Sequence, residues 1–248
     1  MLERTFIHLP KVGPVTERRL WRDGIRCWQD FLQAGRIAGI SPERADLLKS
    51  HLGESCRCLA DGDAAYFARR LPPPEHWRGY PNFRRRTAFL DIETTGLGPP
   101  HRVTVVGVYD GLRTRTYVAG DNLDQFPEDM AQYTLLVTYN GATFDLPFLR
   151  WQFPGLRFDQ MHVDLRYALA RLGLRGGLKS IEERLGLERN ERIAGLNGFD
   201  AVRLWREYEA GSDESLDLLV EYNTADIQNL ERLMELAYQG LAAQLEAD

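Results

Sequence analysis

The chain has 248 residues, of which 44% are hydrophobic, 27% charged and 10% aromatic. This composition is typical of a globular protein and excludes fibrous, low-complexity and wholly disordered chains. No apolar run reaches the roughly 20 residues that cross a bilayer, and the N-terminus lacks the basic and apolar regions of a signal peptide. We therefore expect a cytoplasmic protein with no membrane partner.

The net charge of −5 is unevenly distributed along the chain. Residues 1–86 hold 16 Lys and Arg against 10 Asp and Glu, whereas residues 87–248 hold 15 against 26. A basic segment suits a polyanionic partner such as nucleic acid. An acidic segment is either a solvated surface or a set of carboxylates that gather around metal ions.

The first 71 residues read as short helices separated by glycine-bearing turns. One helix start is clear, because Ser41 supplies an N-cap and Pro42 follows at the first helical position. A proline run then begins a stiff segment. We predict an all-helical domain over residues 1–71, a proline-rich linker over residues 72–84 and a second domain over residues 85–248.

The second domain begins with strand patterns. Residues 87–90 are apolar, residues 103–109 are rich in β-branched side chains, and residues 112–118 alternate after a turn. Helix and strand then alternate, with a helix over about 123–133, a strand over 135–139, a helix after Gly141, a strand over 161–163, and mostly helix to residue 247. Three antiparallel strands followed by this alternation predict an α/β fold, a mixed sheet flanked by helices.

Acidic residues occupy positions where core residues are expected. Asp91 and Glu93 follow an apolar strand and project from the same face, so their charges repel unless a cation such as Mg²⁺ or Mn²⁺ binds them. An acidic, solvated strand end is the alternative. In the last helix, Tyr222 and Asp226 fall on the apolar stripe, where a carboxylate is costly unless it is paired or bound to metal.

A further acid, Asp145, stands in the first turn of a helix just after a strand. It is either a metal ligand or a simple compensation of the helix dipole. Asp164 also precedes a helix, and we expect it to cap that helix.

Three segments together resemble a known family. The segment from Asp91 to Leu97 reads Asp-Ile-Glu-Thr-Thr-Gly-Leu, Asn140 precedes Phe-Asp145, and Tyr222 stands four residues before Asp226. In this order they resemble the three motifs of the DEDD exonucleases of the ribonuclease-H-like superfamily, and the tyrosine marks the DEDDy subgroup. The resemblance spans residues 85–240 and implies a ribonuclease-H-like mixed sheet, here preceded by a small all-helical domain.

The resemblance also implies an activity. In relatives, the positions matching Asp91, Glu93, Asp145 and Asp226 hold two metal ions, Mg²⁺ or Mn²⁺, around the scissile phosphate. The position matching Tyr222 orients or deprotonates the attacking water, and its ordinary pKa near 10 favours orientation. The resemblance therefore implies a 3′-to-5′ exonuclease that acts on the 3′ end of single-stranded or frayed DNA or RNA.

Substrate contacts follow from the same resemblance. Thr94, Thr95 and Leu97 are expected to pack on the terminal nucleotide, and Asn140 is expected to help place the second motif. We also expect Lys179 to reach a phosphate.

The N-terminal region resembles helix-hairpin-helix modules, whose hairpin donates backbone N–H groups to a phosphate. The resemblance covers about 50 residues and rests on the Leu-Pro-Lys-Val-Gly-Pro segment that ends at Pro14. Lys11 replaces the first hairpin glycine and can add a charge contact to a phosphate, but lysine cannot take a glycine-only backbone conformation. Packing or protein contacts are therefore the alternative role of this module.

Two other functions fit parts of the pattern. The protein could be an inactive nuclease fold that serves as a binding scaffold, although all four acids and the tyrosine are present. The Asp-x-Glu-Thr-Thr segment also faintly resembles the start of haloacid-dehalogenase-like phosphatases, but that reading leaves Tyr222 on the apolar stripe unexplained.

Overall fold

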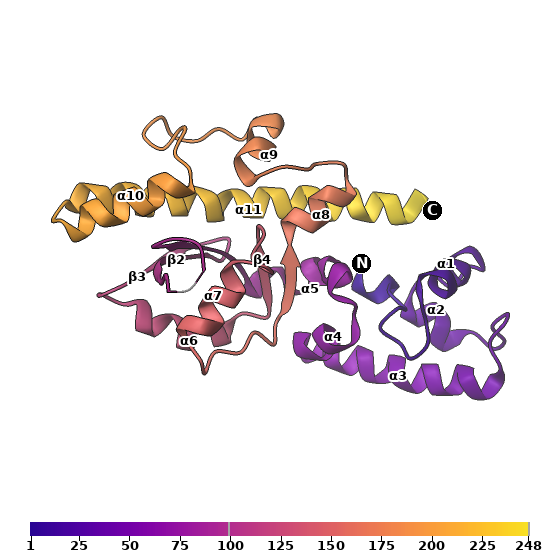
Figure 1. The fold of residues 1–248 in the computed structure, drawn as a ribbon. Coiled ribbons are helices and arrows are strands. Elements are labelled where there is room, and N and C mark those ends of the chain that lie inside the picture. The colour runs from indigo at the N-terminus through magenta and orange to yellow at the C-terminus, as the bar shows by residue number, and fades with distance from the viewer. Residues whose placement is uncertain (99, 248) are drawn as a thin grey trace.

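The computed structural model describes residues 1–98 and 100–247 and contains one mixed five-stranded sheet (Figure 1). The strands lie in the order β3-β2-β1-β4-β5, with β1–β2 and β2–β3 antiparallel and β1–β4 and β4–β5 parallel. Their bounds are β1 Thr87–Thr94, β2 Val103–Tyr109, β3 Thr114–Val118, β4 Leu135–Thr138 and β5 Met161–Asp164. This is the predicted α/β architecture.

The central strand β1 is almost entirely buried and alternates between two apolar cores. Leu90 and Ile92 point into a core shared with α6 (Phe126–Asp129) and α7 (Asp145–Gln152). Phe89 points to the opposite face, where the long helix α11 covers the sheet. Because side chains alternate along a strand, Asp91 and Glu93 share that second face with Phe89.

The C-terminal part of the chain is helical, as predicted. Helix α11 runs beside β1 and β2 and extends toward the N-terminal helices, near which the C-terminus lies (Figure 1). Among the described residues, no helix is both long and apolar enough to cross a membrane. The helices after β5 are α8 Leu165–Arg171, α9 Leu178–Leu185, α10 Gly198–Glu209 and α11 Asp213–Ala247.

The helix expected over residues 123–133 is broken into three short pieces. Helix α6 lies between two 3₁₀ turns, η4 (Leu123–Gln125) and η5 (Met130–Gln132). Pro127, which has no backbone N–H, stands in the first turn of α6 and prevents one continuous helix.

The N-terminal region is helical and shares its apolar core with the sheet. One buried cluster continues from Phe31 and Phe67 through Trp77 to Val137 of β4 and Leu230 of α11. Residues 73–86, most of which fall in the segment with a linker composition, are helical, and residues 76–80 together with Phe83 are buried. The elements are η1 Leu2–Arg4, α1 Pro14–Arg22, α2 Trp28–Gln33, α3 Pro42–Ala60, α4 Ala64–Arg70, η2 Pro73–Gly79, α5 Tyr80–Phe83 and η3 Arg84–Arg86.

Candidate metal centre

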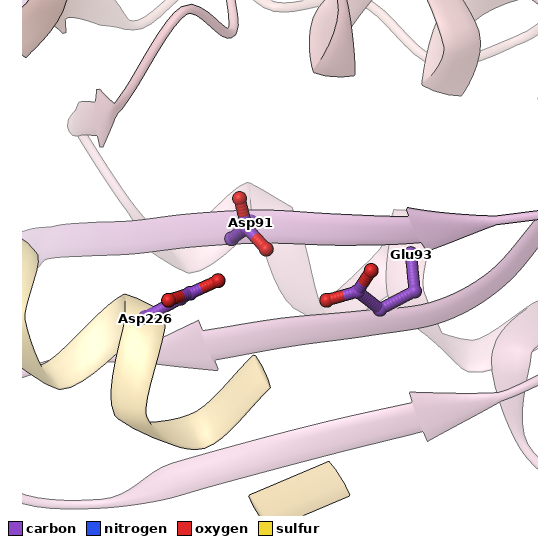
Figure 2. A group of neighbouring side chains, drawn as sticks. All are labelled: Asp91, Glu93 and Asp226. Carbon is purple, nitrogen blue, oxygen red and sulfur yellow. The ribbon is translucent and has the colours of Figure 1, made fainter. Parts of the chain in front are cut away.

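Three carboxylates meet between the central strand and the longest helix. Strand β1 contributes Asp91 and Glu93, and helix α11 contributes Asp226, whose carboxylate lies beside them (Figure 2). One oxygen of each residue lies within 4.8 Å of the corresponding oxygens of the other two. The alternation of β1 and the apolar stripe of α11 therefore bring together three acids that are far apart in sequence.

Asp145 approaches the cluster from another side. It is the first residue of α7, is 3% exposed, and accepts a hydrogen bond from the backbone N–H of Ile92. Among the described residues it does not belong to the compact group of three, yet its charge raises the pKa of Asp91. Asp145 thus lies next to the cluster and is hydrogen-bonded to β1, the strand that carries Asp91 and Glu93.

The cluster carries more negative charge than its surroundings compensate. Burial, followed by repulsion from Asp145, Asp226 and Glu93, raises the pKa of Asp91 well above its usual range. Burial and then repulsion from Asp226 raise the pKa of Glu93 to about 8. Burial raises the pKa of Asp145 to about 7, although backbone hydrogen bonds oppose the shift. Burial and mutual repulsion thus disfavour the simultaneous ionisation of these carboxyl groups, and a bound cation would relieve the repulsion.

Asn223 fixes the two acids of β1. Its Nδ2 donates to Oδ2 of Asp91 at 3.0 Å and to Oε1 of Glu93 at 3.5 Å. The amide fits only because the strand residue opposite Asp91 is Gly107, where a Cβ atom would lie 1.9 Å from Oδ1 of Asn223. Sequence reasoning missed Asn223, although its place between Tyr222 and Asp226 on α11 signals the same buried face.

Two basic side chains, Lys179 and Arg189, lie against Asp226. Lys179 on α9 donates to the hydroxyl of Tyr222, and its Nζ lies 3.8 Å from Oδ2 of Asp226. Arg189, in the segment after α9, donates to the other oxygen of Asp226. Burial, followed by the nearby negative charge of Asp226, raises the pKa of Tyr222 far above its ordinary value, so its hydroxyl stays protonated. The sequence pointed to Lys179 but not to Arg189.

A cavity of about 880 Å³ opens beside these groups. Thr94, Thr95 and Leu97, for which the sequence predicted contacts with a terminal nucleotide, line it together with Tyr222. The hydroxyl of Thr94 donates to the carbonyl of Gly96 at 2.8 Å, so that threonine shapes the loop. Leu97 is 77% exposed, which leaves its side chain available to a ligand.

Asn140 lies outside this cavity and orders the loop that carries Asp145. Its backbone N–H donates to Asp164 at 2.8 Å, and its side-chain oxygen accepts from Thr143 at 2.9 Å. Asp164 caps α8 as predicted, through the N–H of Arg166, and also accepts from the N–H of Ala142. The capping residue therefore also fixes the loop before Asp145.

Lys11 belongs to the N-terminal region, in the turn before α1, and does not line the cavity. Its φ of 57° lies in the left-handed region. The turn thus keeps a conformation that glycine usually supplies, although lysine occupies the position. The lysine carbonyl accepts a hydrogen bond from Arg44 at 2.8 Å, which ties the turn to α3.

The donor set fits hard divalent cations. Every group in the cluster offers carboxylate oxygens, which are the ligands that Mg²⁺ and Mn²⁺ prefer. A bound cation would offset the repulsion that, after burial, contributes to the raised pKa values of Asp91, Glu93 and Asp145.

Comparison with known proteins agrees with this fold. A family model described as RNase_H superfamily matches residues 88–238, so the chain belongs to the RNase H superfamily. This fold does not support the dehalogenase-like phosphatase alternative. No curated protein matches the chain. The structure of the family B DNA polymerase from the hyperthermophilic archaeon Pyrobaculum calidifontis is similar, with 18% identity and a TM-score of 0.44. The match covers 64% of this chain and 24% of the polymerase chain.

Proposed function

We propose that the protein is a metal-dependent 3′-to-5′ exonuclease of the DEDDy type, acting on single-stranded or frayed DNA or RNA. The observation that carries the proposal is the carboxylate cluster on β1 and α11, which is short of positive charge and opens into a cavity. Mg²⁺ or Mn²⁺ bound there supplies charge stabilisation on both sides of a scissile phosphate. Asp91, Glu93, Asp145 and Asp226 are the proposed ligands of two such ions.

Tyr222 is the proposed water-positioning residue. Its hydroxyl keeps its proton, because the pKa is raised, and it accepts a hydrogen bond from Lys179. A protonated hydroxyl can orient a water molecule by hydrogen bonding but cannot act as a strong base. Lys179 is also close enough to the cluster to contact a phosphate oxygen there.

The cavity is the proposed site of the terminal nucleotide. Leu97 and Phe199 expose apolar surface on it, at 77% and 83% of their areas, and bases stack or pack on such side chains. Thr94 and Thr95 shape the loop that presents Leu97. Asn140 acts at a distance, by ordering the loop before Asp145.

The proposal also includes the N-terminal region. We propose that residues 1–71 form a helix-hairpin-helix-like module that contacts nucleic acid through Lys11, and that residues 72–84 connect it to the nuclease domain over residues 85–248. A cytoplasmic location remains part of the proposal.

The test is a gel assay with DNA and RNA oligonucleotides labelled at the 5′ end. We expect a ladder of products shortened from the 3′ end in Mg²⁺ or Mn²⁺ and none in EDTA. Asp91→Asn should abolish the ladder, whereas Asp217→Asn, an exposed acid on α11, should leave it unchanged. Absence of hydrolysis with every substrate and metal would favour the binding-scaffold alternative.

A further inference from the structure

Arg189 is a buried arginine that holds a proposed metal ligand. Its side chain is 9% exposed, and its Nη2 donates to Oδ1 of Asp226. The same guanidinium donates to Oε2 of Glu182 on α9, with the Nε bond at 2.8 Å. The other oxygen of Glu182 accepts from Nδ2 of Asn229 at 3.0 Å. Arg189 therefore stands between two carboxylates, one inside the cluster and one outside it.

The two carboxylates differ in what else they can bind. Glu182 is 1% exposed and is fixed by Asn229, so its position does not depend on the cluster. One oxygen of Asp226 lies within 4.8 Å of one oxygen each of Asp91 and Glu93, so a cation entering the cluster takes an oxygen of Asp226 as a ligand. Arg189 and that cation compete for the same carboxylate.

The guanidinium of Arg189 also has a nitrogen that makes no hydrogen bond to the described residues. Nη1 of Arg189 is buried and, within the part of the chain that the structure describes, has no hydrogen-bond partner. Its two partnered nitrogens are already engaged by Glu182 alone. Arg189 can thus lose Asp226 and remain paired, so its contact with Asp226 is the one that can be exchanged.

We propose that Arg189 is a resident counter-cation, which holds Asp226 while the cluster is free of metal and releases Asp226 when a divalent ion binds. The inference rests on the proposed function, because it takes Asp226 as a metal ligand. Arg189 stabilises the metal-free protein by offsetting repulsion among the carboxylates. It also weakens metal binding, because its contact with Asp226 must be broken first. Glu182 retains the arginine in the site after the exchange.

Two substitutions should move metal affinity in opposite directions. Arg189→Met removes the competitor and keeps the length of the side chain, so the Kd for Mn²⁺ should fall by about tenfold, within the usual range of coupling between two ligands. Glu182→Gln weakens the second partner, so Arg189 holds Asp226 more firmly and the Kd should rise. A purely structural role of the pair would lower the melting temperature in both variants without this opposite change.

The experiment is calorimetric titration of the full metal-free chain with Mn²⁺ alone, together with melting curves before and after titration. We expect Arg189→Met to melt at a lower temperature without metal and to gain more from Mn²⁺ than the wild type. Arg192→Met is the matched control, because Arg192 pairs with Glu221 at the surface and should leave the Kd unchanged. The double variant Glu182→Gln/Arg189→Met removes both buried charges and should bind Mn²⁺ as tightly as Arg189→Met, even if the single variant folds poorly.

The outcomes separate this inference from the proposed function. Equal or weaker Mn²⁺ binding by both Arg189→Met and the double variant overturns the inference and makes Arg189 a support for the ligand geometry. A wild-type protein that binds no Mn²⁺, or binds it as well after Asp226→Asn, overturns the proposed metal site itself, whatever the Arg189 variants do.

Discussion

Two groups of buried charge, one in the N-terminal helices and one beside the sheet, are built in opposite ways. Glu17 is 1% exposed, and its carboxylate accepts from the N–H of Phe6 at 2.6 Å and from Arg78 at 2.8 Å. The Asp91 and Glu93 carboxylates are near other acids instead, and their pKa values are raised. Burial of charge therefore does not identify a functional site by itself. An excess of one sign is a stronger indication, because a bound cation would offset it.

In the Glu17–Arg78 pair the two charges balance each other, so mutation of either residue should lower the stability of the protein. Arg78→Met leaves Glu17 buried without its cation, which should cost ~3–5 kcal/mol in the free energy of unfolding. Urea denaturation measures the loss, and Glu17→Gln/Arg78→Met should recover most of it. The hydrolytic rate of the folded Arg78 variant should equal that of the wild type. A loss below about 1 kcal/mol would show that the pair is not balanced as described.

Mutation of the carboxylate cluster, in which negative charge is in excess, should instead lower activity. Asp91→Asn, Glu93→Gln, Asp145→Asn and Asp226→Asn should each lower turnover by at least ~100-fold, because each removes a ligand of the metal ions. The first two should also melt at an equal or higher temperature than the wild type without metal, since they relieve repulsion. Near-wild-type hydrolysis by any two of these variants in Mg²⁺ and Mn²⁺ would contradict the metal assignment.

Much of the RNase H-like fold could be predicted from the sequence because its signals are local. Strand alternation located β1 to β5 to within a few residues, and the order of antiparallel and parallel pairs followed from their spacing. The packing of residues 73–86 could not be predicted. Prolines there indicate a stiff segment, but whether Trp77 and Tyr80 are exposed or buried depends on partners far along the chain.

The candidate site also has residues that the sequence predicts and residues that it does not. Ordered motifs predicted the acids on β1 and α11, and the structure brings Asp91, Glu93 and Asp226 together. Arg189 follows α9 in a segment without periodicity, 37 residues from its partner Asp226, so no sequence pattern links them. Asn223 requires a space created by Gly107 on a neighbouring strand, which only the sheet register reveals.

Tyr222→Phe tests whether the tyrosine belongs to the catalytic cluster or only to the core. Phenylalanine keeps the packing and loses the hydroxyl, so kcat should fall on the order of 10²-fold while substrate affinity changes little. Single-turnover rates at saturating oligonucleotide, compared with equilibrium binding, separate the two effects. An unchanged kcat would assign Tyr222 to the core and remove it from the proposed catalytic residues.

The raised pKa of Glu93 predicts a pH dependence of the stability of the metal-free protein. Its pKa is about 8 in the folded protein and near 4.5 in the unfolded chain. Glu93 therefore contributes stability below about pH 4.5, and that contribution is lost as the pH rises toward 8. Without metal, the stability advantage of Glu93→Gln over the wild type should grow by more than about 1 kcal/mol between pH 5 and 8. A constant difference across this range would show that Glu93 is ionised throughout.

The smallest expected effect concerns the basic N-terminal region and the contact proposed at Lys11. Its left-handed turn and its position before α1 suit a single contact to a phosphate, and one such contact accounts for about one unit of the salt slope of binding. Lys11→Gln should therefore weaken binding of single-stranded DNA a few-fold at low salt and reduce the slope by about one.

Deleting residues 1–80 is a poor test, because these residues share an apolar core with β4 and α11. The point variant in an Asp145→Asn background keeps that core and prevents hydrolysis during the measurement. Lys49→Gln, which removes the other lysine of the region, controls for the general loss of charge. If Lys11→Gln and Lys49→Gln give the same affinity and slope, the turn before α1 makes no specific phosphate contact, and Lys11 contributes no more than its general positive charge.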